Sequence, residues 1–186
     1  MQALGIAGSP RKGGNTEQYV QQALKAINDE GIETEMVSLA DKDIRPCNAC
    51  MACRRTEKCP IDDDLMPIYQ KMKDADAIII GSPVYFQGST ALTRAFLERS
   101  GYISTQNGRV FAGKVGGPLV VTRRSAASLT YAQMLLWFSG QRFFIPGVMS
   151  TAFGREKGDV LKDEEGMNSA RDFGKGVAFL LKKLKA

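Results

Sequence analysis

The chain has 186 residues, which is enough for one compact domain over residues 1–186 and too few for two full domains. With 44% hydrophobic and 24% charged residues it has the composition of a folded globular protein, and its net charge of +5 favours an anionic ligand or partner. Histidine is absent, which excludes Ser-His and Cys-His nucleophiles, histidine-ligated metals and histidine proton shuttles. Chemistry must therefore rest on other side chains or on a bound cofactor.

Short apolar runs alternate with amphipathic patterns along the whole chain, which predicts an α/β fold with a parallel sheet. The predicted strands cover residues 3–7, 33–39, 77–81, 115–122 and 143–145. The first predicted helix ends at a Gly31 cap, the second starts at the acidic run 62–64, and the third starts at a Ser89 cap. The last two predicted helices cover residues 126–138 and 169–184. Residues 153–165 are polar and charged, and we expect them to form a mobile excursion.

Five strands that alternate with about five helices predict a flavodoxin-like, doubly wound, five-stranded parallel sheet with strand order 2-1-3-4-5. Ligands of such sheets bind beyond the carboxyl ends of the strands. The loops expected at that edge comprise residues 8–16, 40–61, 81–89 and 122–126.

The first of these loops, residues 8–16, has the composition of an anion cradle. Its glycines allow the backbone to approach a ligand closely, Ser9, Asn15 and Thr16 offer donors, and free amides follow at a helix start. It is neither a Walker A loop nor a Gly-x-Gly-x-x-Gly dinucleotide loop. A phosphate monoester would fit there; the alternative is a glycine-rich turn with a helix cap.

The loop after the third predicted strand carries two adjacent aromatic residues, Tyr85 and Phe86. At the ligand edge they would provide an apolar surface for a planar ring system. The alternative is that both rings fold back into the core.

Together these loops resemble the NADPH-dependent FMN reductase branch of the flavodoxin-like flavoproteins, through the patterns G-S-P-R-x-x-G-N-T and S-P-V-Y-F-x-x-S. The resemblance implies an FMN phosphate held by Ser9, Arg11, Gly14, Asn15 and Thr16. It implies an isoalloxazine ring lined by Pro83, Val84, Tyr85, Phe86, Gly88 and Ser89. A third, less diagnostic contact would fall at Thr122 and Arg123.

The four cysteines form the strongest single motif, Cys47-x2-Cys50-x2-Cys53-x5-Cys59, within a predicted cluster-binding insertion at about residues 44–61. A disulfide framework would spread its cysteines more widely, and the run is too compact for a zinc ribbon. Three cysteines at every third position can surround one centre, which fits a [4Fe–4S] cluster and echoes the bacterial ferredoxin run. The alternatives are a zinc knuckle, a pair of disulfides, or a redox-reactive loop without a ligand.

This motif inside an FMN-reductase-like chain resembles the iron-sulfur flavoproteins of anaerobic archaea and bacteria. That family implies one FMN and one [4Fe–4S] cluster per subunit, in a homodimer or homotetramer whose flavins and clusters approach each other near subunit interfaces. We therefore predict an FMN-dependent oxidoreductase with cofactor-based chemistry and no catalytic side chain, which exchanges electrons with a redox protein such as a ferredoxin. The alternative is an NAD(P)H-dependent FMN or quinone reductase without a functional cluster.

Other partners are not expected. The apolar N-terminal segment is short and lacks a basic region, and no stretch approaches the length of a membrane span, so we expect a cytoplasmic protein without a membrane partner. The basic residues are dispersed, and the lysines near residue 183 complement a helix dipole, so no nucleic acid is expected.

Overall fold

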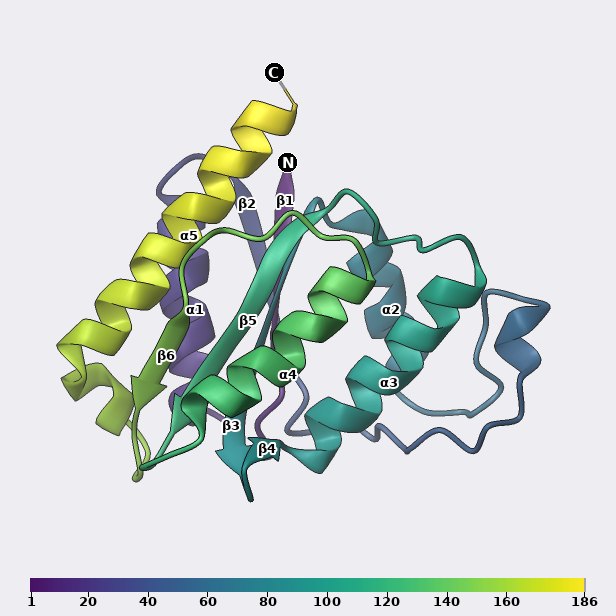
Figure 1. Ribbon diagram of the computed structural model, residues 1–186, viewed down its shortest axis with the longest axis horizontal. Helices are drawn as coiled ribbons and strands as arrows, with labels where there is room; N and C mark the ends of the chain where they lie inside the picture. Colours follow the sequence, from purple (N-terminus) through teal and green to yellow (C-terminus); the bar gives the residue numbers. More distant parts are fainter. Residues whose placement is uncertain (186) are drawn as a thin grey trace.

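The computed structural model describes residues 1–185 as a twisted parallel sheet with helices on both faces (Figure 1). The strands are β1 (Gln2–Ala7), β2 (Glu33–Ser38), β3 (Ala77–Tyr85), β4 (Gly88–Ser89), β5 (Val115–Thr122) and β6 (Ser150–Phe153). The helices are α1 (Asn15–Asn28), α2 (Leu65–Asp74), α3 (Ala91–Gln106), α4 (Ala127–Gly140) and α5 (Glu164–Leu184), with the short 3-10 helices η1 (Ala52–Arg54) and η2 (Asp159–Lys162).

The sheet order is β2-β1-β3-β5-β6, and β4 pairs antiparallel with the end of β3. All neighbours along the main sheet are parallel, so the predicted doubly wound topology is confirmed. Among residues 1–185 no helix is long and apolar enough to cross a membrane.

Two cores explain why residues 77–80, at the centre of the sheet, are all apolar. On β3, Ile78 and Ile80 belong to the core beneath α2, α3 and α4, whereas Ile79 belongs to the core beneath α1 and α5. Side chains alternate between the two faces of a strand, so a strand segment that is covered on both faces favours apolar side chains at successive positions.

The fifth parallel strand differs from the prediction. Residues 143–145 contribute only an isolated bridge between Phe144 and Val115, and β6 takes the edge position beside β5. Phe143 is buried because it packs edge-on against Phe138, with ring centroids 4.9 Å apart. The apolar run at 143–145 therefore reflects core packing rather than strand pairing.

Several element ends also differ from the prediction. β3 continues to Tyr85 and turns into the β3–β4 hairpin, and Thr90 caps α3 in place of Ser89. α1 ends at Asn28, with Gly31 at a φ of 81° in the turn that follows. α5 begins at Glu164, inside the predicted excursion, because the Asp163 carboxylate accepts a hydrogen bond from the Gly166 N–H.

Candidate functional site

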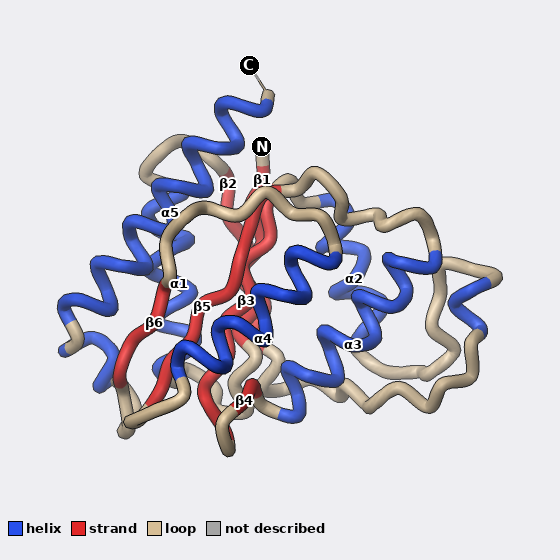
Figure 2. Tube along the Cα trace, viewed as in Figure 1, coloured by secondary structure: helices blue, strands red, loops and turns tan. Residues whose placement is uncertain are grey.

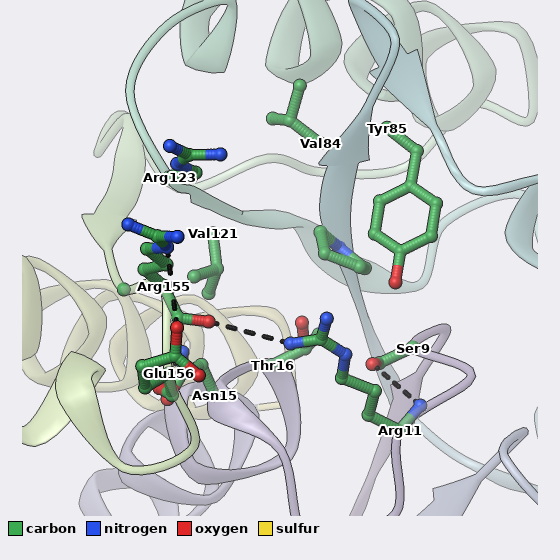
Figure 3. Close-up of a pocket in the computed structure, with 12 residues that line it drawn as sticks. Ser9, Arg11, Asn15, Thr16, Val84, Tyr85, Val121, Arg123, Arg155 and Glu156 are labelled. Atoms are coloured by element: carbon green, nitrogen blue, oxygen red, sulfur yellow. Dashed lines mark hydrogen bonds and ion pairs between the residues drawn. The ribbon is translucent and has the colours of Figure 1, made fainter.

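A cavity of about 400 Å³ opens at the carboxyl ends of β1, β3 and β5, where the topology predicted a ligand (Figure 3). Four segments distant in sequence supply its walls. The lining residues are Ser9, Arg11, Asn15, Thr16, Pro83, Val84, Tyr85, Val121, Arg123, Gly154, Arg155 and Glu156. The cavity thus brings together most of the residues predicted to bind a cofactor.

One end of this cavity is built for an anion. The N–H groups of Asn15 and Thr16 begin α1 and have no acceptor within residues 1–185. The guanidinium groups of Arg11, Arg123 and Arg155 come from three different segments and face the same space (Figure 3). Free helix-terminal amides and arginines together favour a phosphate group.

Gly14 shapes this end without lining it. It precedes α1 in an extended conformation and donates its N–H to the Arg11 carbonyl at 3.2 Å. A Cβ atom at Gly14 would lie 2.9 Å from that carbonyl oxygen, so glycine permits the turn that brings Arg11 to the cavity.

A buried hydroxyl network joins the first loop to the β3–β4 segment. The Gly8 carbonyl accepts hydrogen bonds from Thr90 Oγ1 at 2.7 Å and from Thr93 Oγ1 at 2.8 Å. Ser82 Oγ lies 3.2 Å from Thr93 Oγ1, and the Gly8 N–H donates to the Gly81 carbonyl. These bonds fix the phosphate end of the cavity relative to its wall at Pro83 to Tyr85.

The aromatic pair divides between two surfaces, and neither ring folds into the core. Tyr85 is 44% exposed and lines the cavity, whereas Phe86 is fully exposed at the tip of the hairpin with a φ of 45°. Phe86 lines an adjoining hollow of about 280 Å³ with Thr122, Arg123 and others. Thr122 shapes that loop, because its hydroxyl donates to the Ser125 carbonyl at 2.6 Å.

Gly88 and Ser89 line neither hollow. They form β4, where the Ser89 N–H and hydroxyl both hydrogen-bond to Gln133 Oε1 of α4. Their place in the structure is therefore to anchor the hairpin on α4.

The four cysteines surround a second cavity, of about 160 Å³, between the segment after β2 and α3. All four are free thiols; Cys47 and Cys50 are exposed, and Cys53 and Cys59 are half-buried. Burial raises the pKa of the Cys53 thiol. The four side chains line one space, but within residues 1–185 no three candidate ligands lie close enough together to hold a metal ion.

A buried ion pair connects this cysteine segment to α3. Arg99 and Asp63 have side chains that are 1% and 0% exposed. The guanidinium donates to both carboxylate oxygens of Asp63, to the Arg45 carbonyl at 2.9 Å and to Cys59 Sγ at 3.1 Å. Burial alone would raise the pKa of Asp63, but hydrogen bonds from Arg99 and from the Arg45 and Leu65 N–H groups hold it below its ordinary value.

The model of the NADPH-dependent FMN reductase family matches residues 1–156. An iron-sulfur flavoprotein of Methanocaldococcus jannaschii is 41% identical, over all of both chains. The chain belongs to the iron-sulfur flavoproteins of the FMN reductase family. An iron-sulfur flavoprotein of Methanosarcina thermophila is 33% identical, over all of this chain and 97% of its relative.

Solved structures agree on the fold. RosB with a bound 8-demethyl-8-formylriboflavin-5'-phosphate aligns with a TM-score of 0.81 at 19% identity, over all of this chain and 80% of that one. An archaeal flavodoxin aligns with a TM-score of 0.67 at 13% identity, over 98% and 99% of the two chains. Membership of the FMN reductase family makes this flavoprotein an FMN-dependent oxidoreductase.

The segment 154–156 of this flavoprotein was missed by sequence reasoning, which treated it as part of a mobile excursion. Asn15 Nδ2 donates to the Glu156 carbonyl at 2.8 Å, and Asn15 Oδ1 accepts from the Gly158 N–H at 2.8 Å. The Asn15 side chain thus holds this segment, and its backbone N–H is free to donate to an anion. A strand at 150–153 would have placed Arg155 at the ligand edge, but the fifth strand was predicted at 143–145.

The flavoprotein's two cavities have no lining residue in common. The segment between β2 and α2 starts at the edge where the first cavity opens, but it is almost all loop and extends along α3 (Figure 2). Asn107 Nδ2 donates to the Cys53 carbonyl at 2.9 Å and fastens η1 to the end of α3. The cysteine cavity therefore faces α3 rather than the first cavity.

Proposed function

We propose that this flavoprotein transfers electrons between FMN, a [4Fe–4S] cluster and an external redox protein. When bound, FMN exchanges one or two electrons and the cluster exchanges one electron at a time. The observation that carries the proposal is that all four cysteines of the chain line one cavity. The names of the curated relatives support it.

In this proposal the first cavity holds FMN. Arg11 and the amides that start α1 would bind the phosphate, and Pro83 to Tyr85 would lie against the ring. The rigid hydroxyl network around Gly8 would keep these two contacts at a fixed separation. The chain's own part in the chemistry is then to bind and orient the flavin, in keeping with its lack of histidine.

The second cavity suits an iron-sulfur cluster by the chemistry of its donors. Cys47, Cys50, Cys53 and Cys59 would supply four thiolates, the usual ligand set for such a cluster. Arg99 adds a buried cation beside Cys59, and its Nε is buried without an acceptor within the described chain. A negatively charged group that accepts hydrogen bonds therefore fits this wall.

Anaerobic purification followed by metal, sulfide and flavin analysis tests the proposal. We expect brown protein with about four iron and about four sulfide per chain, about one FMN, and an EPR signal that appears on reduction. Cys50→Ser should lose the cluster signal and keep FMN, because Cys50 does not line the flavin cavity. A colourless protein that contains zinc would refute the cluster.

The second candidate function is direct NAD(P)H-dependent reduction of FMN or a quinone, which the description of the matching family favours. Stopped-flow mixing of NADPH with wild type and with Cys50→Ser separates the two. Under our proposal, electrons reach the external redox protein more slowly in Cys50→Ser than in wild type. Steady NADPH turnover that is unaffected by Cys50→Ser would instead favour the reductase.

We propose that the redox partner is an acidic electron carrier of the ferredoxin kind. Arg55 and Lys58 are exposed on the segment between Cys53 and Cys59, two residues that line the cysteine cavity, and their side chains form no ion pair within residues 1–185. Cations at the rim of an interface speed association with an acidic partner and do so less at high salt.

The double variant Arg55→Gln, Lys58→Gln should slow electron exchange with reduced ferredoxin at low salt and flatten the salt dependence of that exchange. An unchanged salt dependence would exclude this docking surface.

A further inference from the structure

The guanidinium of Arg99 is divided between a carboxylate, a carbonyl and a sulfur. We propose that Arg99 is a positioning residue for the cluster site: it orients Cys59 as a ligand through its Nη2–H···Sγ hydrogen bond and stabilises the more reduced state of the bound cluster. The inference rests on the proposed function, because it concerns the cluster that the four cysteines would bind.

The geometry assigns separate acceptors to the two ends of the guanidinium. Nη1 donates to the Arg45 carbonyl at 2.9 Å and to Asp63 Oδ2. Nη2 donates to Asp63 Oδ1 at 3.1 Å and to Cys59 Sγ at 3.1 Å. Asp63 in turn accepts from the Arg45 and Leu65 N–H groups at 3.0 Å and 3.1 Å, so the Arg99 fork is fixed in place before any ligand binds.

A buried charge at Arg99 is not needed simply to anchor the cysteine segment to α3. A buried ion pair contributes little to stability compared with apolar side chains of the same volume, whereas its charges persist as a local field. Here the positive end touches the sulfur of a predicted ligand, whereas the nearby cation Arg54 donates to the Tyr102 hydroxyl instead of a cysteine. The pair therefore affects the cluster site more directly than it affects the fold.

The direction of the effect follows from charge. One-electron reduction makes a four-thiolate cluster more negative, and hydrogen bonds to the ligand sulfurs, like a nearby cation, stabilise the more negative state. Without Arg99 the cluster's midpoint potential should therefore shift to a more negative value. The FMN potential should stay unchanged, because Arg99 does not line the flavin cavity.

The experiment compares the cluster potential in three variants of the anaerobically purified holoprotein, titrated with dithionite and followed by EPR. Arg99→Met, Asp63→Asn removes both buried charges together, so that no unpaired carboxylate remains, and the introduced amide oxygen still offers an acceptor to the backbone. Arg99→Lys keeps the charge but loses the planar fork. Arg94→Gln is the matched control, because Arg94 is exposed on the same helix and its side chain forms no hydrogen bond or ion pair in the described chain.

We expect a negative shift of the cluster midpoint and faster iron loss to a chelator in the double variant, a smaller shift in Arg99→Lys, and none in Arg94→Gln. FMN content and FMN potential report whether each variant is folded. If the double variant does not retain FMN, Arg99→Lys decides by its midpoint and its EPR line shape. Equal cluster midpoints in wild type and in every variant that retains FMN would overturn the role of Arg99, whereas a wild type without iron and sulfide would overturn the proposed function as well.

Discussion

Arg11 is the residue on which the predicted anion end of the flavin cavity depends most directly. It is exposed, its N–H is held by Ser9 Oγ at 3.1 Å, and its guanidinium reaches the Arg155 carbonyl at 3.5 Å across the cavity. We expect Arg11→Gln to weaken FMN binding by roughly 10-fold to 100-fold, the range for losing one hydrogen bond to a charged group. Quenching of flavin fluorescence during titration of the apoprotein measures the change.

Riboflavin provides the control for this variant, because it has the ring system but no phosphate. Wild type and Arg11→Gln should bind riboflavin equally well if Arg11 recognises the phosphate. An equal loss of affinity for FMN and riboflavin would place Arg11 against the ring instead.

Asp76 gives a prediction about acid stability that is independent of both cavities. Burial would raise the pKa of its carboxyl. Hydrogen bonds from the Lys185 side chain and, at 2.9 Å, from the Gln2 N–H instead hold that pKa below the ordinary 3.8. A lowered folded-state pKa adds stability that is present above the unfolded pKa and is lost as the pH falls through the folded value.

We therefore expect Asp76→Asn to lower the unfolding free energy by about 1 kcal/mol at pH 7 and by less at pH 3, since the wild-type advantage fades on protonation. Chemical denaturation at both pH values measures this difference. Asp74→Asn is the control, because Asp74 is exposed and, within residues 1–185, its carboxylate accepts a hydrogen bond only from the Gln70 side chain, at 3.0 Å. A constant difference between Asp76→Asn and wild type would show that protonation of Asp76 is irrelevant to stability.

At the scale of elements, the sequence predicted best where burial alone determines a strand. β5 was predicted from residue 115 to 122, as found, because both of its faces are covered and every residue is buried. β6 was missed because an edge strand of four residues, with Phe153 exposed, has no continuous apolar run. Most residues that line the first cavity were predicted by their place after a strand, whereas the Arg99–Asp63 pair joins residues 36 positions apart and leaves no local pattern.

The contact between α1 and the 154–160 segment carries the next prediction. Asn15 holds the Glu156 carbonyl and the Gly158 N–H, which are otherwise on an exposed loop. Asn15→Ala removes these two hydrogen bonds, so the backbone amides of residues 154–160 should exchange their hydrogens faster. The amides of the strands should remain as protected from exchange as in wild type. Mass spectrometry of exchange in the holoprotein measures this effect.

Asn28→Ala is the matched control, since Asn28 lies at the other end of α1 and donates only to the Ile32 carbonyl at 3.3 Å. In that variant residues 154–160 should exchange as in wild type. Unchanged exchange in Asn15→Ala would mean that η2, rather than Asn15, holds the segment.

For the whole molecule, the separation of the two cavities bears on assembly. Their linings have no residue in common, so under the proposed function an FMN could exchange electrons with the cluster of a neighbouring subunit. α4 offers a surface for such contact. It has no charged residue, it anchors the β3–β4 hairpin beside the flavin cavity, and it exposes Leu129 and Leu136, seven residues apart on one face.

In a homodimer or homotetramer built on this surface of α4, we expect Leu136→Asp to produce smaller species, because the charge would be buried in an apolar contact. Light scattering coupled to gel filtration should then show a mass nearer the 20.3 kDa of one chain.

Phe179→Asp is the control, because Phe179 is 60% exposed on α5, which covers the opposite face of the sheet. If FMN exchanges electrons with the cluster of a neighbouring subunit, Leu136→Asp should also slow electron exchange between flavin and cluster while FMN content stays unchanged. An unaltered mass would exclude α4 as the contact, and a smaller mass with unaltered exchange would mean that each subunit connects its own two sites.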